Sequence, residues 1–182
     1  MRRFFLLAFV LSLYSTPIAG QDAASLSPQV KAFVSLEDPV FAVSHVRVMD
    51  GTGTAALEDQ TLVVSHGKIQ AVGPASTVQP PPGATVLDGT GHTLIPGIVG
   101  MHDHIFYPAG SGHYNTLEYS APRLYLAAGV TTIRTTGSLE PYAEMGLRDA
   151  IRAGQVPGPE MHVTSPYLEG PGAFTYQMHE LE

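Results

Sequence analysis

The sequence has no cysteine and no tryptophan, and only 14% of its 182 residues are charged. The lack of cysteine excludes a small scaffold held by disulfide bonds, and it leaves the redox compartment open. Basic residues are also few, 9 against 16 acidic ones, which gives a net charge of −7. Because such a surface repels phosphate and the basic residues never cluster, no nucleic-acid partner is expected. The hydrophobic content of 44% excludes a disordered tail.

The chain also lacks an apolar run long enough to span a bilayer, which needs about 20 residues. Its longest apolar stretch, residues 4–13, follows Arg2 and Arg3 and precedes the small residues Ala19 and Gly20. This pattern predicts a secretory signal over residues 1–20, and therefore export to the periplasm or outside the cell. No membrane span is expected once the signal is removed, and the alternative is an uncleaved membrane anchor.

Glycine and proline are abundant, with 19 and 15 copies, which is typical of strand-rich or α/β proteins with many turns. Residues 21–39 are polar and favour a linker, with one helical turn near residues 30–34. Residues 40–95 predict a small β subdomain, in which His66-Gly67 favours a tight type I′ hairpin. Its four expected strands are Phe41–Val48, Thr61–Ser65, Lys68–Val72 and Ala84–Leu87. Four such short strands make a thin core, so the sheet is expected to pack on something larger.

The chemistry of the sequence begins after a continuous apolar run, Ile98–Met101, which predicts a strand buried on both faces. The run ends in His102, Asp103 and His104. Positions i and i+2 of a strand share a face, so the two imidazoles can converge on one metal ion at about 2.0–2.1 Å. Asp103 is expected to point the other way and to orient neighbouring groups. A lone His-x-His pair also occurs by chance on surface strands.

The residues that follow predict alternating helices and strands. A Gly/Pro-rich loop is expected first, and the inner face of the second helix is expected to include Tyr142, Met145, Ala150 and Ala153. The expected elements are the loop Tyr107–Gly112, a helix over Thr116–Ala128, a strand over Val130–Ile133, a helix from Pro141 to Ala153, and a strand over Met161–Thr164. The order β-α-β-α-β predicts parallel strands in an α/β sheet or barrel.

Four segments, in this order, resemble the N-terminal part of a metal-dependent amidohydrolase of the imidazolonepropionase-like branch, which includes enzymes acting on Xaa-Pro dipeptides. They are Val48–Gly53, Gly67–Gly73, Leu94–His104 and Ala128–Arg134. The resemblance covers about residues 41–165. It implies an α/β fold: the start of a (β/α)₈ TIM-like barrel, about two and a half βα units over residues 96–182, preceded by a small β-sandwich subdomain.

The resemblance also implies a chemistry. His102 and His104 would bind one or two divalent metal ions, most often zinc. The exported enzyme would hydrolyse a carbon–nitrogen bond through a metal-activated water, in a small amide, cyclic amide or Xaa-Pro-type substrate. Tyr107, His113 and Glu169 are candidate substrate contacts on loops near the site, although loop packing would also explain them.

Other parts of the family's site have no counterpart in the 182 residues. A bridging lysine or acid, two further histidines and the aspartate base are expected beyond residue 182, since Lys31 and Lys68 both precede the barrel. The sequence is therefore expected to be incomplete and catalytically inert alone. A non-catalytic amidohydrolase-like binding module and an exported structural β protein are the alternatives. The substrate, the number of metal ions and the formation of a homo-oligomer stay open.

Overall fold

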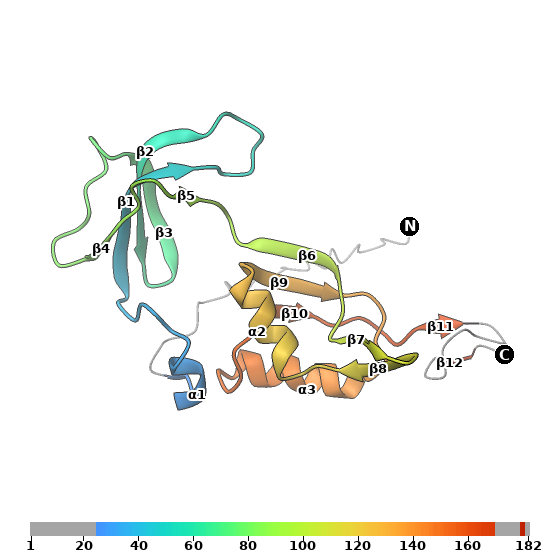
Figure 1. Cartoon of the computed structure of the whole chain (residues 1–182). Coiled ribbons are helices and arrows are strands. Elements are labelled where there is room, and N and C mark those ends of the chain that lie inside the picture. Colours follow the sequence, from blue (N-terminus) through green and yellow to red (C-terminus); the bar gives the residue numbers. More distant parts are fainter. Residues whose placement is uncertain (1–24, 170–178, 181–182) are drawn as a thin grey trace, which may run out of the picture.

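The computed structural model describes residues 25–169 and 179–180, which form two lobes (Figure 1). The predicted signal segment, residues 1–20, lies outside the described residues. Within the described ranges no helix is both long and apolar enough to cross a bilayer. A short helix, α1 (Pro28–Lys31), occupies the predicted linker, and the Ser27 side chain caps it. The Ser27 backbone N–H donates to the Gly154 carbonyl at 2.8 Å, so the linker is fixed to the second lobe.

The first lobe is a five-stranded sheet in the order β3-β2-β1-β4, with β5 also paired to β1. Its strands are β1 (Val40–Val48), β2 (Leu57–Ser65), β3 (Lys68–Pro74), β4 (Thr85–Asp88) and β5 (Thr93–Leu94). The pairs β1–β2 and β2–β3 are antiparallel, whereas β4 and β5 run parallel to β1. The four strands expected from the sequence are confirmed, and β5 was too short to be detected by alternation.

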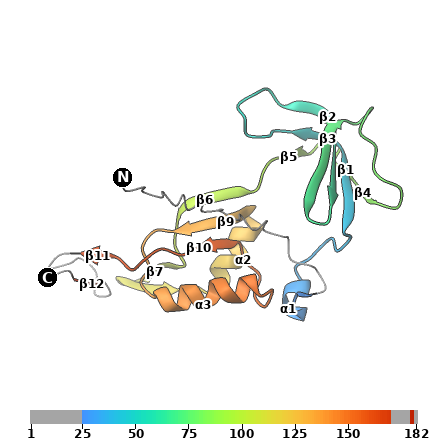
Figure 2. The same ribbon diagram turned by 180° about the vertical axis from the view of Figure 1, so that it is seen from behind.

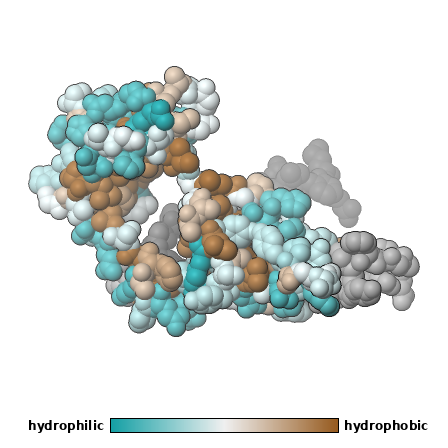
Figure 3. All heavy atoms as spheres, viewed as in Figure 1, coloured by the Kyte–Doolittle hydropathy of each residue, from teal (hydrophilic) through white to brown (hydrophobic). Residues whose placement is uncertain are grey.

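Local chemistry explains the hairpin between β2 and β3. His66 and Gly67 have φ angles of 49° and 72°, which are the positive values that a type I′ turn needs at both central positions. The core of this lobe is thin, as expected: its buried apolar side chains are Ala42, Val46, Val48, Leu62 and Val63. Large apolar side chains on its edge strands β3 and β4 stay exposed, as the space-filling view shows (Figure 3).

The second lobe contains a parallel sheet in the order β10-β9-β6. Its strands are β6 (Ile98–Asp103), β9 (Val130–Thr135) and β10 (Glu160–His162), connected by the helices α2 (Ser120–Ala127) and α3 (Pro141–Arg152). The predicted β-α-β-α-β order and the parallel pairing are therefore confirmed. Both helices lie on the same side of the sheet (Figures 1 and 2). The core between them consists of Ile105, Ala121, Ile133, Leu147, Ile151 and Met161.

The prediction that the first strand of this sheet is buried on both faces is wrong for the described residues. Ile98, Val99 and Met101 are 46%, 54% and 64% exposed. The reason is that β6 is an edge strand of the described sheet, so that only β9 pairs with it. The two helices cover one face of the sheet and leave the other face of β6 open (Figure 2). A continuous apolar sequence is typical of a strand that is covered on both faces. The described residues cover β6 only in part.

The segment after β6 is a hairpin where the sequence predicted a loop. The strands β7 (Phe106–Gly110) and β8 (His113–Thr116) pair antiparallel. The turn runs through Gly110, Ser111 and Gly112, which have φ angles of 96°, 53° and 75°. Glycine at two of these three positions permits this backbone at little cost. Because β8 uses residues up to Thr116, α2 begins at Ser120, later than predicted.

The inner face of α3 also differs from the prediction. Tyr142 is 87% exposed and Met145 is 41% exposed, while Glu144, Leu147 and Ile151 are buried against the sheet. These three residues have the i, i+3, i+7 spacing of one helical face. Because the first of these positions is the acidic Glu144, a search for apolar residues alone did not detect this face. Leu124 of α2, an apolar residue within the helix predicted over Thr116–Ala128, is 66% exposed.

A last strand pair, β11 (Leu168–Glu169) with β12 (His179–Glu180), follows β10. The bridge between Ser138 and Pro166 lies just before it and joins the segment after β9 to the segment after β10. Both segments follow the carboxyl ends of parallel strands, where ligands of α/β folds bind. The fold therefore brings the loops after β6, β9 and β10 to one end of the sheet.

Candidate metal site at the carboxyl end of β6

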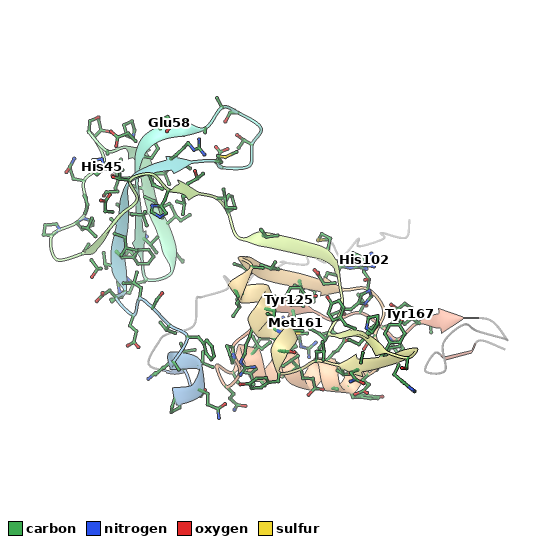
Figure 4. The ribbon with its side chains drawn as sticks, viewed as in Figure 1. His45, Glu58, His102, Tyr125, Met161 and Tyr167 are labelled. Atoms are coloured by element: carbon green, nitrogen blue, oxygen red, sulfur yellow. The ribbon has the colours of Figure 1, made fainter. Side chains whose placement is uncertain are left out.

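His102 lies at the carboxyl end of β6 (Figure 4), and its ring is in contact with the ring of His104. Their ring centroids are 5.4 Å apart and the ring planes are 83° apart, so the rings meet edge to face. Here Gly100 pairs with Ile133 and Asp103 with Thr135, so β6 uses one more residue than β9 over this stretch. Such a bulge bends the strand and redirects side chains, and it is common beside functional sites.

The electrostatics favour a neutral imidazole at His104. Its Nδ1 is buried and has no hydrogen-bond partner among the described residues. Burial is the main cause that lowers the pKa of His104, and the neighbouring His102 adds to this effect; the backbone of Gly137 and the charge of Asp103 act in the opposite direction. A neutral imidazole with an unpaired nitrogen is the form that binds a metal ion. His102, by contrast, is exposed at the edge of the sheet.

Two tyrosines hold the backbone of His104 in place. The Tyr125 hydroxyl of α2 donates to the His104 carbonyl at 2.9 Å. The Tyr107 hydroxyl of β7 lies 2.7 Å from the Tyr125 hydroxyl, so that Tyr107 donates and Tyr125 accepts. Burial is the main cause that raises the pKa of Tyr125, which keeps this phenol protonated and able to donate at neutral pH. The helix and the hairpin therefore both fix the residue that ends β6.

Aromatic rings line one side of the histidine pair. The Phe106 ring lies 4.6 Å from the His104 ring, between centroids, and within 5.8 Å of Tyr114 and 6.4 Å of Tyr167. Phe106 and Tyr114 come from the β7–β8 hairpin, whereas Tyr167 comes from the segment after β10. Figure 4 shows Tyr167 at the same end of the sheet as His102. This aromatic cluster keeps part of the site apolar, which strengthens electrostatic interactions inside it.

Asp103 lies between the two histidines in sequence and behaves differently from them. Its Oδ2 is buried without a hydrogen-bond partner among the described residues. A Cβ built on Gly100 would lie only 1.7 Å from that oxygen, so the carboxylate folds back over a position that glycine leaves free. The Asp103 carbonyl accepts from the Thr136 N–H at 3.1 Å. Asp103 thus ties the end of β6 to the loop after β9, and its predicted orienting role stays a prediction.

The three predicted substrate contacts differ in exposure and in how they are connected to the histidine pair. Tyr107 is 40% exposed and reaches the site through Tyr125. His113 is exposed at the start of β8, on the hairpin. The backbone of Glu169 lies in β11, and its side chain lies outside the described residues. Over the described ranges no three histidine, aspartate or glutamate side chains gather closely enough to hold a metal ion. The described site therefore offers two converging imidazoles.

No family model matches the chain. Among curated proteins, an imidazolonepropionase of Idiomarina loihiensis is 35% identical over 69 residues, which are 38% of this chain and 17% of that protein. An enamidase of Eubacterium barkeri is 30% identical over 82 residues, or 45% of this chain and 21% of the enamidase. Among solved structures, a Bifidobacterium longum protein assigned as a prolidase has a TM-score of 0.65 and 34% identity, covering 78% of this chain and 34% of that one.

The chain belongs to the amidohydrolase superfamily. Its relatives place it on the imidazolonepropionase-like branch, as the four segments of the sequence predicted, and their names denote hydrolases that act on carbon–nitrogen bonds. The mixed α/β fold is shared with the solved neighbour. This amidohydrolase chain spans about a third or less of the length of the proteins it matches.

Sequence reasoning missed several residues around the histidines of this amidohydrolase chain. Tyr125 lies in the helix predicted over Thr116–Ala128, and nothing in the sequence distinguishes a tyrosine that packs from one that also donates a hydrogen bond. Phe106 lies two residues after His104, and its period-2 relation to His102 and His104 was a usable signal. Glu144 could have been found only by testing whether Leu147 and Ile151 continue a stripe that begins at an acidic residue.

Proposed function

We propose that this chain contributes to an exported, metal-dependent hydrolase that cleaves a carbon–nitrogen bond in a small amide, cyclic amide or Xaa-Pro-type substrate. The observation that carries the proposal is the convergence of the His102 and His104 rings at the carboxyl end of β6. The same end of a parallel sheet is where α/β folds place their chemistry. The names of the relatives support the class of bond, and the export rests on residues 1–20 of the sequence.

The residues present fit a divalent metal ion. His104 has a buried, unpaired Nδ1, and the lowered pKa of this imidazole keeps it neutral and able to coordinate. His102 supplies a second imidazole on the solvent side. A bound ion, zinc in the first instance, would supply a water of lowered pKa and a Lewis acid for the scissile carbonyl. One ion or two would be compatible with this pair.

The surrounding side chains hold and shield the pair. Tyr125 fixes the His104 backbone, while the rings of Phe106 and Tyr167 limit the access of water to one side of it. The β7–β8 hairpin places Tyr107 and His113 where a substrate approaching His102 can touch them. Glu169, on the segment after β10, is proposed as a further substrate contact.

We also propose that β6, β9 and β10 are the first three strands of a (β/α)₈ barrel over residues 96–182, and that residues 40–95 belong to a β-sandwich. The parallel order, the crossover helices and the exposed apolar face of β6 support the barrel. A covered face would bury Ile98, Val99 and Met101, as the sequence of β6 demands. A structure of a chain as long as the relatives, with β6 still at a free sheet edge, would contradict this proposal.

A non-catalytic amidohydrolase-like binding module is the second candidate. The observation that favours it is that the described residues bring together two imidazoles and no third metal-ligating side chain. The same observation has a simpler account in the catalytic proposal, in which the remaining ligands and the base come from residues outside the described ones. The two candidates differ in one measurable property, which is turnover of a carbon–nitrogen substrate.

The test compares the 182-residue chain with a longer chain of the relatives' length, using cyclic amides, anilides and Xaa-Pro dipeptides as substrates. We expect the longer chain to hydrolyse at least one class, to lose that activity with a chelator and to regain it with zinc. We expect the 182-residue chain to be inert, because two imidazoles alone bind zinc weakly. Activity that survives complete metal removal, or a zinc-loaded longer chain inert on every class, would argue against the enzyme.

Export is tested separately from catalysis. If residues 1–20 are a signal, protein recovered from the periplasm or the medium should begin at Gln21. N-terminal sequencing reads this directly. An N-terminus at Met1 on cytoplasmic protein would contradict export without affecting the proposed chemistry.

A further inference from the structure

A cavity of about 540 Å³ lies on the first lobe, and none of the residues of the histidine pair or its surroundings line it. Its lining comes from β1, from the start of β2, and from β5 with the loop before it. Figure 4 shows two of the lining residues, His45 and Glu58, on this lobe and away from His102. The volume is in the range of pockets that hold small molecules. The name β1–β2 pocket is used for this cavity.

Two β-bulges form one wall of the β1–β2 pocket. Before them, Val43 of β1 pairs with Leu62 of β2. After them, Val48 pairs with Leu57, and equal numbers of residues separate the two pairs on the two strands. In between, the register shifts once through an extra residue in β1 and once through an extra residue in β2, so the second shift cancels the first. The bulges therefore leave the pairing of the sheet unchanged, and their effect is the local redirection of side chains.

Each bulge contains a residue with a left-handed backbone. His45 of β1 has a φ of 58° and Asp59 of β2 has a φ of 51°. Such angles cost energy for residues other than glycine, and they cluster at functional sites. The two side chains meet, because the His45 Nδ1 lies 2.7 Å from the Asp59 Oδ1. They are 61% and 66% exposed, so this contact contributes too little to stability to account for two strained residues.

The pocket carries charges of both signs. Arg47 lines it together with His45. The Arg47 Nε donates to the Thr93 Oγ1 at 3.0 Å, which orients the guanidinium, and its Nη groups contact no acceptor among the described residues. The carboxylates of Glu58 and Asp59 line the same pocket. Within the described ranges Glu58 has no cationic partner, and Asp59 pairs through only one of its two oxygens. A fixed cation and two available carboxylates therefore share one cavity.

The loop before β5 supplies the remaining side of the pocket. The His92 Nδ1 lies 3.1 Å from the Thr90 carbonyl. Because a carbonyl oxygen only accepts, the Nδ1 is the donor, and the Nε2 is left for a ligand. Gly91 has a φ of 77°, and a Cβ built on it would meet nothing within 4 Å. This side of the pocket is therefore open to an entering molecule.

We propose that the β1–β2 pocket binds a small zwitterion with the ammonium and carboxylate groups of an amino acid or dipeptide. Its carboxylate would meet Arg47 and His92, and its ammonium group would meet Glu58 and Asp59. The planar guanidinium suits a carboxylate. A ligand with a single charge would face like charge on one wall, whereas a zwitterion complements both walls. The inference does not depend on the proposed function, because no residue assigned to hydrolysis lines this pocket.

The test is a titration of the isotope-labelled full chain with glycylglycine, followed by NMR at the backbone amides of Gly91 and Thr93. We expect saturable shifts with a dissociation constant on the order of 1 mM, because each exposed charge pair contributes little. N-acetylglycine is glycylglycine without the amine, and glycylglycinamide lacks the carboxylate. Each of these analogues should bind at least about fivefold more weakly, since each loses one set of charge contacts.

Variants of the pocket make the result specific. Arg47→Gln and Glu58→Gln should each weaken the binding of glycylglycine at least about fivefold. Lys68→Gln is the matched control, because Lys68 is exposed on β3 of the same lobe and does not line the pocket. His45→Gly relieves the left-handed backbone, so it should keep or raise the stability of the first lobe in urea unfolding while it weakens binding.

The absence of saturable shifts in the natural chain would overturn the inference. So would binding of either single-charge analogue as tight as that of glycylglycine, because one charge would then suffice. Equal losses in Arg47→Gln and Lys68→Gln would also overturn it, since the effect would be one of net charge. A longer chain that hydrolyses no carbon–nitrogen substrate would contradict the proposed function and leave the result of this titration unaffected.

Discussion

Replacing His104 with alanine should reduce zinc affinity of the longer enzyme by more than about 100-fold and abolish its hydrolysis. Outer-shell partners of metal ligands are worth about 10–100-fold each, so a direct ligand is expected to exceed that range. His104 is the better-placed imidazole of the pair, because its Nδ1 is buried and unpaired and its backbone is fixed by Tyr125. Metal content by mass spectrometry and hydrolysis rates measure the two effects independently.

His102→Ala should give the same phenotype, since the pair is proposed to act on one ion. His113→Ala is the matched control: this histidine is exposed on the β7–β8 hairpin, and we expect its replacement to leave the metal content unchanged. If His104→Ala and His102→Ala both keep stoichiometric metal, the two rings are not ligands. Loss of metal in all three variants would instead indicate a general loss of structure.

Replacing Ile133 with alanine should destabilise the second lobe by about 2–5 kcal/mol, the range for deleting a fully buried aliphatic side chain. Ile133 is 0% exposed and lies in the central strand β9, paired with Gly100 of β6 and Met161 of β10. A cavity at this point loosens the strand that aligns both neighbours. Because β6 ends in the histidine pair, Ile133→Ala should lower both the stability of the second lobe and its affinity for metal. Urea unfolding followed by circular dichroism measures the first effect.

A graded series makes this result specific. Ile133→Val should cost about 0.5–1.5 kcal/mol, and Thr131→Ala, at an exposed position of the same strand, should change stability by less than about 0.5 kcal/mol. If Ile133→Ala costs no more than Thr131→Ala, the core around β9 is packed differently from the arrangement described. An equal cost for all three would point to a general effect of changing the strand.

Local signals made much of this fold predictable. The hairpin turn at His66-Gly67 and the four strands expected over residues 41–87 each depend on residues close in sequence. The parallel sheet followed from the order of the later elements. The proximity of the His102 and His104 rings was predictable for the same reason, since positions i and i+2 at the end of a strand share a face, whereas their role as metal ligands stays a prediction.

The remainder depended on contacts between distant residues. The exposure of β6 could not be predicted, because the hydrophobicity of a strand does not show whether another segment of the protein packs on it. The inner face of α3 was misassigned because Glu144 is polar and yet buried beside Leu147 and Ile151. Likewise, the role of Tyr125 depends on Tyr107 and on the His104 carbonyl, neither of which is near it in sequence.

The central claim is that the imidazoles of His102 and His104 hold one cation together. Diffraction from the zinc-loaded longer enzyme, with anomalous data at the zinc edge, tests it most directly. The account predicts an anomalous peak with one nitrogen of each ring at about 2.0–2.1 Å. A zinc peak elsewhere in the molecule, or two rings turned away from each other with water between them, would contradict it.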